Sequence, residues 1–402
     1  MNIVFCKWTS ICETGVDHGL TALGHHIIRI TRLLDSVDYD MEYANLLSDT
    51  LTQNEVDCVF SVNFIPIIAR VCKIHKTPYI CWIVDSPCFQ LYSETIIYPT
   101  NHIFIFDRDL YNKFLPLNPE GIYHYSLASD MKTWDNVHVT EADHRAYDCD
   151  ISFVGSLYSE KTRYNSIAGS LPDYLQGYVS GIIDAQCNVF GYNLIRDSLT
   201  PAFVEEFKRY AKWIPLGDDY VEDDLGIVAD TYIGYKCTEQ DRIRTLNALA
   251  EHFSVDLYTQ SDTACLKNVH VKGPADSERM MPQIMKCSKI NLNLTNKPIS
   301  SGLPLRCFDI MGCGGFMISN YQPEIPELFE LDREVVVYTS IPELIDKVSY
   351  YLAHEEERIA IARRGYEKVK QYHSYEVKLN HILETACGSN TPPLGANLLK
   401  RS

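Results

Sequence analysis

The stretch Ser288–Asn320, SKINLNLTNKPISSGLPLRCFDIMGCGGFMISN, decides the fold class of this chain. Its apolar run at residues 289–294 predicts a strand of a covered parallel sheet. Residues 303–311 predict a helix with Pro304 in its first turn, which three glycines end before the next strand begins. The order of strand, loop, helix and strand is the repeating unit of an α/β protein with a doubly wound sheet.

The loop before the predicted helix has the features of an anion-binding site. Backbone N–H groups near Gly302 and the positive end of the helix dipole favour a phosphate group at this point. Arg306 lies one turn inside the helix and could form a bidentate hydrogen bond to phosphate oxygens. Asp309 lies three residues further on the same face and could accept hydrogen bonds from a ribose diol. The alternative is an ordinary ion pair between Arg306 and Asp309 on a packed helix.

Length and charge limit the classes of protein to which this chain can belong. Its 402 residues are enough for two domains with separate cores, and a hydrophobic content of 46% indicates a globular protein. The net charge of −17 argues against nucleic acid or an anionic membrane surface as a partner. An anionic substrate would therefore need a local cluster of arginines, lysines and helix ends.

Targeting signals, membrane spans and metal-binding cysteine pairs are not expected. The N-terminal sequence MNIVFCKWTS lacks the cleavage pattern of a signal peptide. No apolar run reaches the roughly eighteen residues that indicate a transmembrane helix. The 14 cysteines are scattered and include no C-x-x-C pair, so we expect reduced thiols in a cytoplasmic protein without a zinc site.

Strands and helices alternate along the first third of the chain, which predicts a parallel, doubly wound sheet. In such sheets, ligands lie beyond the carboxyl ends of the strands. The predicted strands are residues 2–6, 27–30, 57–63, 79–84 and 102–106. Four polar residues follow a strand end or begin the next helix: Glu13, Asn63, Asp85 and Asp107.

A polar stretch near residues 135–148 predicts the link to a second domain. Residues 170–235 predict a helical insertion, whose acidic loop at residues 218–224 we expect to be a solvated face. Ser374 can cap a last helix, and the polar tail carries no regular pattern. The predicted division is a first domain at 1–147, a second at 148–372, a helix at 373–387 and a disordered tail at 388–402.

A second set of candidate residues follows strands of the second domain. Gly155 and Ser156 come directly after a predicted strand, and a glycine there permits close approach of a ligand to the backbone. A polar run with Lys161 and Arg163 follows. Another predicted strand ends at Lys272 and Gly273, so these residues would lie at the same edge of the sheet.

Motifs along most of the chain resemble one known family. VFSVNF and ICWIVDSP in the first domain, DISFVGSLY at the start of the second, and the stretch from SKINLNLT to GYEKV are similar to the CgeB-like, spore-maturation-type glycosyltransferases. The resemblance covers about residues 1–387. It implies the GT-B architecture, with two Rossmann-like domains that face a cleft and a final helix that crosses back to the first domain. It also implies a sugar nucleotide on the C-terminal domain, an acceptor on the N-terminal domain and no metal ion or other cofactor.

The resemblance and the needs of glycosyl transfer together suggest how the donor is bound, since the charge of the leaving group must be stabilised. Arg306 and the N–H groups near Gly302 would hold the diphosphate. Lys161 or Arg163 would help from across the cleft. Asp309 would bind the ribose.

The remaining donor contacts and the reaction's stereochemistry depend on other loops. Gly155 and Ser156 would line the closing face, while Lys272 and Gly273 would approach the nucleotide base. One departure from related retaining enzymes is Ser301, which occupies the position of the first of their two glutamates, eight residues before Asp309. The resemblance therefore leaves open whether the reaction inverts or retains configuration.

On the acceptor side, Asp85 is the first candidate for a catalytic carboxylate or general base, and Glu13 is the second. Each residue has a structural alternative. Asp85 could form a turn before Ser-Pro, and Glu13 could compensate the dipole at a helix start.

We therefore expect a metal-independent glycosyltransferase that uses a nucleoside-diphosphate sugar and a protein, glycan or cell-surface acceptor. The alternative is a non-catalytic carbohydrate-binding or spore-surface assembly protein with the same fold, for which Ser301 leaves room. In a third interpretation, Asp107 and Asp109 form the metal-binding D-x-D motif of a GT-A enzyme, but this spacing recurs elsewhere in so acidic a chain. Three histidines, His18, His25 and His26, fit a surface helix end better than a metal cluster.

Overall fold

The structure, a computed structural model, describes residues 1–211, 213, 216–217, 219–221 and 223–388. The described chain forms two compact units. The first comprises the described residues of Met1–Thr133, Gly217–Val221 and Lys370–Ser402, and the second those of Trp134–Leu216 and Glu222–Val369. The predicted boundary at residues 147 and 148 therefore falls inside the second unit. Apart from Gly388, the predicted tail lies outside the described residues.

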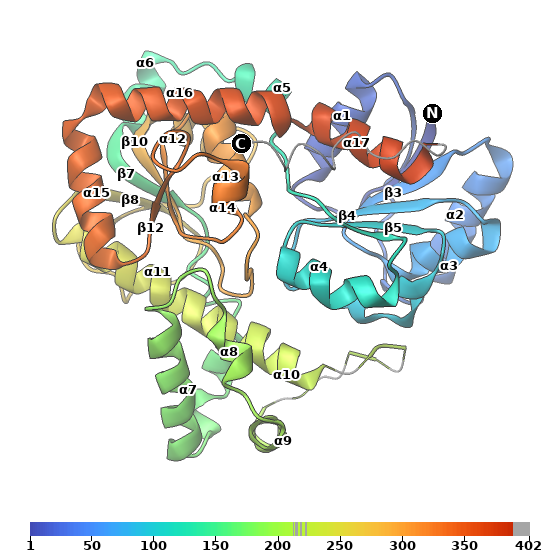
Figure 1. Ribbon diagram of the computed structural model, residues 1–402, viewed down its shortest axis with the longest axis horizontal. Coiled ribbons are helices and arrows are strands. Elements are labelled where there is room, and N and C mark those ends of the chain that lie inside the picture. Colours follow the sequence, from blue (N-terminus) through green and yellow to red (C-terminus); the bar gives the residue numbers. More distant parts are fainter. Residues whose placement is uncertain (212, 214–215, 218, 222, 389–402) are drawn as a thin grey trace. The chain divides into compact units, whose positions relative to one another are not determined.

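The first unit contains a six-stranded sheet in which every neighbouring pair is parallel, in the order β2-β1-β3-β4-β5-β6. Its central strands are almost entirely apolar because helices cover both faces. Figure 1 shows α1 and α17 on one face of this sheet and α3 and α4 on the other. The strands are β1 (Asn2–Cys6), β2 (His26–Ile30), β3 (Cys58–Val62), β4 (Tyr79–Ile83), β5 (Asn101–Ile105) and β6 (Ile122–His124).

The second unit contains another six-stranded parallel sheet, in the order β12-β11-β10-β7-β8-β9. Strands β10 and β7 are central neighbours, so the loops that follow them lie side by side at the carboxyl edge. The core beneath them is built from aliphatic and aromatic side chains of both strands and of the helices that cover them. The strands are β7 (Cys149–Val154), β8 (Val255–Tyr258), β9 (His270–Gly273), β10 (Ser288–Asn293), β11 (Met317–Asn320) and β12 (Val336–Tyr338).

Helices alternate with the strands in both units, as the sequence predicts. A π-helical segment, Val228–Gly234, leads from α10 into α11. The α-helices are α1 (Glu13–Ala22), α2 (Met41–Gln53), α3 (Pro66–His75), α4 (Arg108–Phe114), α5 (Met131–Asp135), α6 (Glu141–Tyr147), α7 (Asp173–Gln186), α8 (Leu194–Asp197), α9 (Pro201–Lys208), α10 (Asp224–Ile227), α11 (Tyr235–Ala250), α12 (Met280–Cys287), α13 (Leu305–Gly312), α14 (Ile325–Leu328), α15 (Ile341–Ala353), α16 (Glu355–Tyr372) and α17 (Tyr375–Cys387).

The last helix, α17, packs on α1 of the first unit. Two glycines of α1 make this close approach possible. A Cβ atom at Gly15 would lie 2.4 Å from a ring carbon of Tyr375, and one at Gly19 would lie 2.6 Å from a methyl carbon of Leu379. Ser374 caps the helix, since its hydroxyl accepts a hydrogen bond from the N–H of Val377 at 3.3 Å. The predicted return of the final helix to the first domain is therefore confirmed.

The acidic loop of the helical insertion is not simply a solvated face, and that prediction is wrong for its described part. Asp219 forms an ion pair with Arg70, in which Oδ2 of Asp219 lies 3.0 Å from Nη2 of Arg70. The Tyr220 hydroxyl donates to Asp38 at 2.6 Å, and a backbone bridge joins Tyr220 to Ser93. The acidic composition of this loop indicated a solvated face. In the structure, however, residues 217 and 219–221 belong to the first unit, and the side chains of Asp219 and Tyr220 have partners there.

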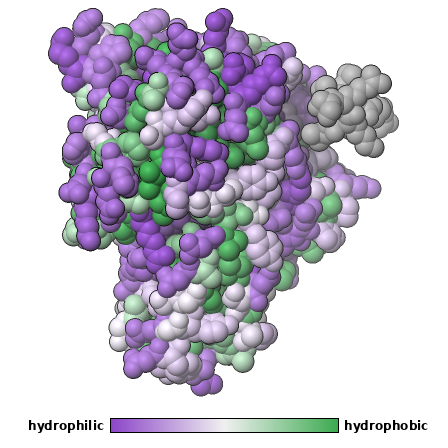
Figure 2. Space-filling model, turned by 60° about the vertical axis from the view of Figure 1, so that its left-hand side comes forward, coloured by the Kyte–Doolittle hydropathy of each residue, from purple (hydrophilic) through white to green (hydrophobic). Residues whose placement is uncertain are grey.

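The face of the molecule in Figure 2 is predominantly polar, and its apolar areas are interrupted by polar side chains. This surface agrees with a chain that carries a net charge of −17. None of the helices in the described part of the chain combines the length and hydropathy that a bilayer-spanning segment needs.

Candidate donor and acceptor sites

A polar pocket lies at the carboxyl ends of β10 and β11 in the second unit. It is open to solvent and is bounded on its other side by the loop that follows α7. Four of its polar side chains are at least nine-tenths buried: Gln186, Thr295, Asn320 and Gln322. Buried amides and hydroxyls in fixed positions are the groups that recognise the hydroxyls of a small polar ligand.

One buried cation, Lys297, lines this pocket. Its Nζ lies 3.0 Å from Asp241 Oδ2 and 5.0 Å from the ring centre of Phe190, and its side chain is 8% exposed. Burial alone would lower the pKa of Lys297, but the Asp241 carboxylate and the nearby Cys237 and Cys187 together outweigh burial and hold the pKa above its ordinary value. Lys297 is therefore a fixed positive charge beside the pocket, and sequence analysis did not identify it.

The loop before α13 brings a carboxylate to Ser301. The Ser301 hydroxyl donates a hydrogen bond to Glu324 Oε1 at 2.7 Å, and the Glu324 N–H donates to the Ser301 carbonyl at 3.2 Å. Both residues are buried. The carboxylate that the sequence suggested was lost at position 301 is thus supplied beside it by a residue that precedes α14.

The predicted phosphate and ribose residues lie on α13, as expected. Asp309 is 7% exposed, and Arg306 is half-buried with its guanidinium in contact with Met281 Sδ. Burial lowers the pKa of Arg306, while the nearby Asp309 carboxylate acts in the opposite direction. The charges of Arg306 and Asp309 therefore interact along one helix. Their roles in binding a nucleotide remain predictions.

The loop after β7 is tied to the end of β10 by a buried arginine, Arg242 of α11. Its guanidinium donates to the Ser156 carbonyl and to the Leu294 carbonyl, each at 2.5 Å. Its Cζ lies 4.8 Å from the ring centre of Tyr158. Burial lowers the pKa of Arg242. Sequence analysis missed this residue because an arginine in the middle of a helix carries no sign of a long-range partner.

The residues predicted after β7 surround this tie. The Gly155 N–H donates to the Tyr258 carbonyl at 3.0 Å, and the Ser156 hydroxyl donates to Glu160 at 2.5 Å. Lys161 and Arg163 are exposed, and Lys161 Nζ lies 4.6 Å from the ring centre of Tyr158. The structure thus places Gly155 and Ser156 after the end of β7, the strand beside β10, with two basic side chains at the surface beyond them.

Lys272 and Gly273 lie on the edge strand β9, away from this group. Three strand spacings separate β9 from β10, which is about 14 Å. Lys272 Nζ pairs with Asp256 at 3.1 Å, and Gly273 has a positive φ of 82° with open space beside it. An approach of these residues to a nucleotide base remains a prediction, and it would need a ligand that extends along the sheet edge.

In the first unit, Glu13 holds the loop between β1 and α1. Its two carboxylate oxygens accept hydrogen bonds from the Trp8 N–H at 2.6 Å and the Thr9 N–H at 3.2 Å. The side chain is 4% exposed, and Thr9 has a positive φ of 82°. These contacts favour a role in fixing the loop over a role in proton transfer.

Asp85 lies exposed after β4 and is oriented by Asn63. The Asn63 amide donates to Asp85 Oδ2 at 2.6 Å, and its oxygen accepts from the Val84 N–H at 2.9 Å. Asn63 is buried and has a positive φ of 60°, a conformation that asparagine tolerates better than most residues. The arrangement presents one carboxylate at the carboxyl edge of the first sheet.

Asp107 does not behave as part of a metal-binding D-x-D motif. Its Oδ1 accepts hydrogen bonds from the Asp109 N–H at 3.0 Å and the Leu110 N–H at 3.2 Å, which caps α4. The side chain is 1% exposed. Capping therefore accounts for the aspartate that follows β5.

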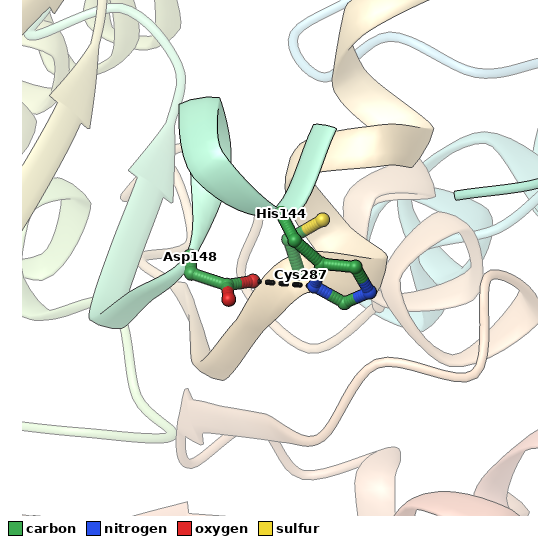
Figure 3. A group of neighbouring side chains, drawn as sticks. All are labelled: His144, Asp148 and Cys287. Carbon is green, nitrogen blue, oxygen red and sulfur yellow. Dashed lines mark hydrogen bonds and ion pairs between the residues drawn. The ribbon is translucent and has the colours of Figure 1, made fainter. Parts of the chain in front are cut away.

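A different trio, His144, Asp148 and Cys287, places three possible metal ligands within 4.8 Å of one another (Figure 3). His144 Nδ1 already lies 2.8 Å from Asp148 Oδ1. Burial first, and then nearby carboxylates, raise the pKa of the Cys287 thiol to about 11. A structural zinc site usually takes four protein ligands, so three donors of which two are exposed do not make one.

Comparison with known proteins assigns a family model to only part of the chain. Residues 241–384 match a model described as glycosyl transferase-like. This region runs from α11 to α17 and contains the loop before α13, Lys297 and Glu324. The search of curated proteins found no match.

Solved structures with the same fold cover nearly the whole chain. Anabaena Alr3699/HepE in complex with UDP-glucose aligns with 11% identity over 96% of this chain and 99% of its own, with a TM-score of 0.53. A glycosyltransferase from Rickettsia africae ESF-5 aligns with 12% identity over 96% and 99%, with a TM-score of 0.54. A putative UDP-N-acetylglucosamine 2-epimerase from Listeria monocytogenes aligns with 10% identity over 98% of each chain, with a TM-score of 0.50. The chain therefore has the two-domain GT-B fold that the sequence predicts.

Proposed function

We propose that this protein transfers a glycosyl group from a nucleoside-diphosphate sugar to an acceptor. The observation that carries the proposal is one of position: the glycosyl transferase-like match at residues 241–384 contains the loop before α13 and half of the residues that line the polar pocket. Ligands of doubly wound sheets lie at this edge, beyond the carboxyl ends of the strands.

Positive groups of the second unit suit a nucleoside diphosphate. Lys297 is a buried cation that lines the pocket, Arg306 is a half-buried cation on α13, and the N-terminus of α13 adds its N–H groups. In a chain with a net charge of −17, such a local cluster is what an anionic ligand would require. We assign the diphosphate to this cluster and the ribose to Asp309.

The buried amides of the pocket suit the glycosyl group. The pocket is lined by Asn320 and Gln322 from β11 and its following loop, by Gln186 at the end of α7 and by Thr295 after β10. The carboxylate of Glu324 lies next to Ser301 at the same strand end. These groups would bind sugar hydroxyls and orient the anomeric carbon.

The finer parts of the proposal rest on the sequence resemblance. They are membership of the CgeB-like subfamily, a protein, glycan or cell-surface acceptor, independence of metal ions and a cytoplasmic location. The fourteen cysteines are all unpaired in the structure, which is compatible with a reducing compartment. Addition of EDTA should leave the rate unchanged, and abolition of activity by EDTA would contradict metal independence.

The experiment is release of nucleoside diphosphate from UDP-, GDP- and dTDP-sugars by the full chain. We expect release from at least one donor, and loss of release in Arg306→Ala and Asp309→Ala. Arg333→Ala is the matched control, since Arg333 is an exposed arginine paired with Glu330 at 3.0 Å. Binding of a donor without any release would favour the alternative, a non-catalytic carbohydrate-binding protein with a GT-B fold.

A further inference from the structure

Two buried cysteines of the second unit lie in contact beside the polar pocket. Cys187 directly follows the last residue of α7, and Cys237 lies in the first turn of α11, 50 positions later in the chain. Their Sγ atoms are 3.7 Å apart. A disulfide bond joins sulfur atoms at about 2.05 Å, so a movement of about 1.7 Å would bring the two atoms to bonding distance.

The two thiols differ in exposure and in acidity. Cys187 is 7% exposed, whereas Cys237 is 0% exposed. A hydrogen bond from the Cys237 thiol lowers the pKa of Cys187, with help from the charges of Lys297 and Arg244, although burial acts in the opposite direction. The same hydrogen bond, followed by burial, raises the pKa of Cys237. A more acidic and more accessible thiol beside a second thiol is the arrangement of a redox-sensitive cysteine and its resolving partner.

The residue that precedes Cys187 organises one wall of the pocket. The Gln186 amide nitrogen donates to the Val189 carbonyl at 3.1 Å and to the Tyr192 carbonyl at 2.9 Å. Gln186 and all of residues 189–193 line the pocket. A movement of Cys187 toward α11 would therefore displace Gln186 and the loop that folds around its amide.

We propose that Cys187 and Cys237 form a reversible disulfide, with a hydroperoxide as the oxidant, and that this bond weakens ligand binding in the pocket. The control of donor binding rests on the proposed function, whereas the disulfide does not. A hydroperoxide is chosen as the oxidant because a small molecule can reach a thiol of low exposure.

The reaction has two steps when hydrogen peroxide is the oxidant. The Cys187 thiolate attacks one oxygen, the O–O bond breaks, and a sulfenic acid forms. The hydroxide that leaves takes up the proton that the thiol lost and becomes water. The Cys237 thiol then attacks the oxidised sulfur, so that an S–S bond forms and the S–O bond breaks. The second hydroxide leaves with the Cys237 proton, again as water. Two thiols are thus oxidised to one disulfide, and the peroxide is reduced to water.

Peptide mapping of the full chain tests the disulfide directly. The protein is treated with hydrogen peroxide, alkylated with N-ethylmaleimide in urea and cleaved with trypsin, which places the two cysteines on the separate peptides 164–196 and 237–242. We expect these peptides to be joined after peroxide and to separate after dithiothreitol. Two peptides that are alkylated separately after peroxide would overturn the proposal.

Serine variants test which thiol reacts first. In Cys237→Ser, Cys187 should stay a sulfenic acid and be labelled by dimedone. In Cys187→Ser, Cys237 should remain unlabelled, since it is fully buried. Cys265→Ser is the matched control, because it removes an exposed thiol and should leave the disulfide unchanged. Labelling of Cys237 in Cys187→Ser, or no labelling of Cys187 in Cys237→Ser, would overturn the assignment of the reactive thiol.

Hydrogen exchange tests the effect on the pocket without any ligand. Peroxide should slow the exchange of the backbone amides of residues 188–194, because the bond anchors the end of α7 to α11, and should leave it unchanged in Cys187→Ser. Nucleotide release is then measured with UDP-glucose, UDP-N-acetylglucosamine, GDP-mannose and dTDP-glucose. On oxidation it should fall by at least about fivefold, the lower end of the usual coupling between two sites, and recover with dithiothreitol.

The outcomes distinguish this inference from the proposed function. A disulfide that forms without changing either hydrogen exchange or nucleotide release would overturn the control of the pocket. Absence of release in both redox states would overturn the proposed function and the control of donor binding with it. The disulfide would still stand or fall on the peptide map.

Discussion

Ser301 and Glu324 are 23 positions apart in the chain, and the hydroxyl of the first donates to a carboxylate oxygen of the second at 2.7 Å. Both side chains are buried at the strand end where the proposed donor binds. A carboxylate is therefore present beside position 301, although residue 301 itself is a serine. Glu324 is the residue that supplies it, from a segment that follows β11 instead of β10.

Glu324→Gln should lower nucleotide release while the protein stays folded. The amide can still accept the Ser301 hydrogen bond, but it removes the charge. Hydrogen bonds to charged groups contribute roughly 1.5–3 kcal/mol, which corresponds to about a 10- to 100-fold loss of rate. Ser301→Ala, which keeps the carboxylate, is the matched variant and should lose less. Equal rates for Glu324→Gln and the unsubstituted protein would contradict a role for this charge.

Lys297→Met should destabilise the second unit by about 3–5 kcal/mol, because it leaves the carboxylate of Asp241 buried without its partner. The double variant Lys297→Met, Asp241→Leu should recover part of this loss, since it removes both charges. Urea unfolding followed by the fluorescence of the second unit checks the difference. A double variant that is less stable than the single one would show that the pair is not the cause.

Lys378 predicts a pH dependence of the first unit. Burial lowers its pKa to about 7, and its Nζ donates to the Ser126 hydroxyl at 2.7 Å. Between about pH 7 and the ordinary lysine pKa of about 10.4, the unfolded chain binds a proton that the folded chain does not. Stability should therefore rise with pH across this window and stay at its lowest below it.

Lys378→Met tests that dependence. The variant should be more stable than the unsubstituted protein near pH 7, by up to a few kcal/mol, and its stability should rise less steeply between pH 7 and 10. Lys132→Met, at an exposed position of the same unit, is the control. The readout is the melting temperature of the first unit's transition as a function of pH. A parallel profile for Lys378→Met and the unsubstituted protein would contradict burial of a neutral amine.

Asn63→Gly should reduce activity without straining the backbone. Glycine accepts the positive φ of 60° at this position, but it removes the amide that orients Asp85. If Asp85 contacts the acceptor, Asn63→Gly and Asp85→Asn should raise KM by similar factors and leave the acidic limb of the pH–rate profile intact. Loss of that limb in Asp85→Asn would instead identify Asp85 as the base.

The sequence predicted the features that depend on neighbours along the chain. The strand before residue 295, the helix with Asp309 and the last helix with its Ser374 cap follow from local patterns of apolar residues, prolines and caps, whereas the return of the last helix to the first domain was implied by the family resemblance. Each of these patterns lies within a single helix or strand, so the element could be predicted without knowledge of the tertiary fold. The parallel, doubly wound sheets followed from the order of the elements.

The partners of polar side chains could not be predicted in the same way. Glu324, Lys297 and His18 pair with residues that are 23, 56 and 112 positions away, respectively. No local spacing in the sequence predicts such a pair. Lys272 was grouped with the other strand ends because the strand order, which puts β9 at an edge, is a property of the fold. Asp219 was assigned to solvent from composition alone, whereas its partner Arg70 lies in a helix of the first unit.

Calorimetric titration with UDP, GDP and dTDP tests whether a nucleoside diphosphate binds the second unit at the loop before α13. We expect one of them to bind at one site per chain, and Arg306→Ala and Asp309→Ala each to weaken this binding at least about tenfold, or about 1.4 kcal/mol. Arg333→Ala should bind it unchanged. Binding that survives both substitutions on α13 with the same affinity would contradict the claim.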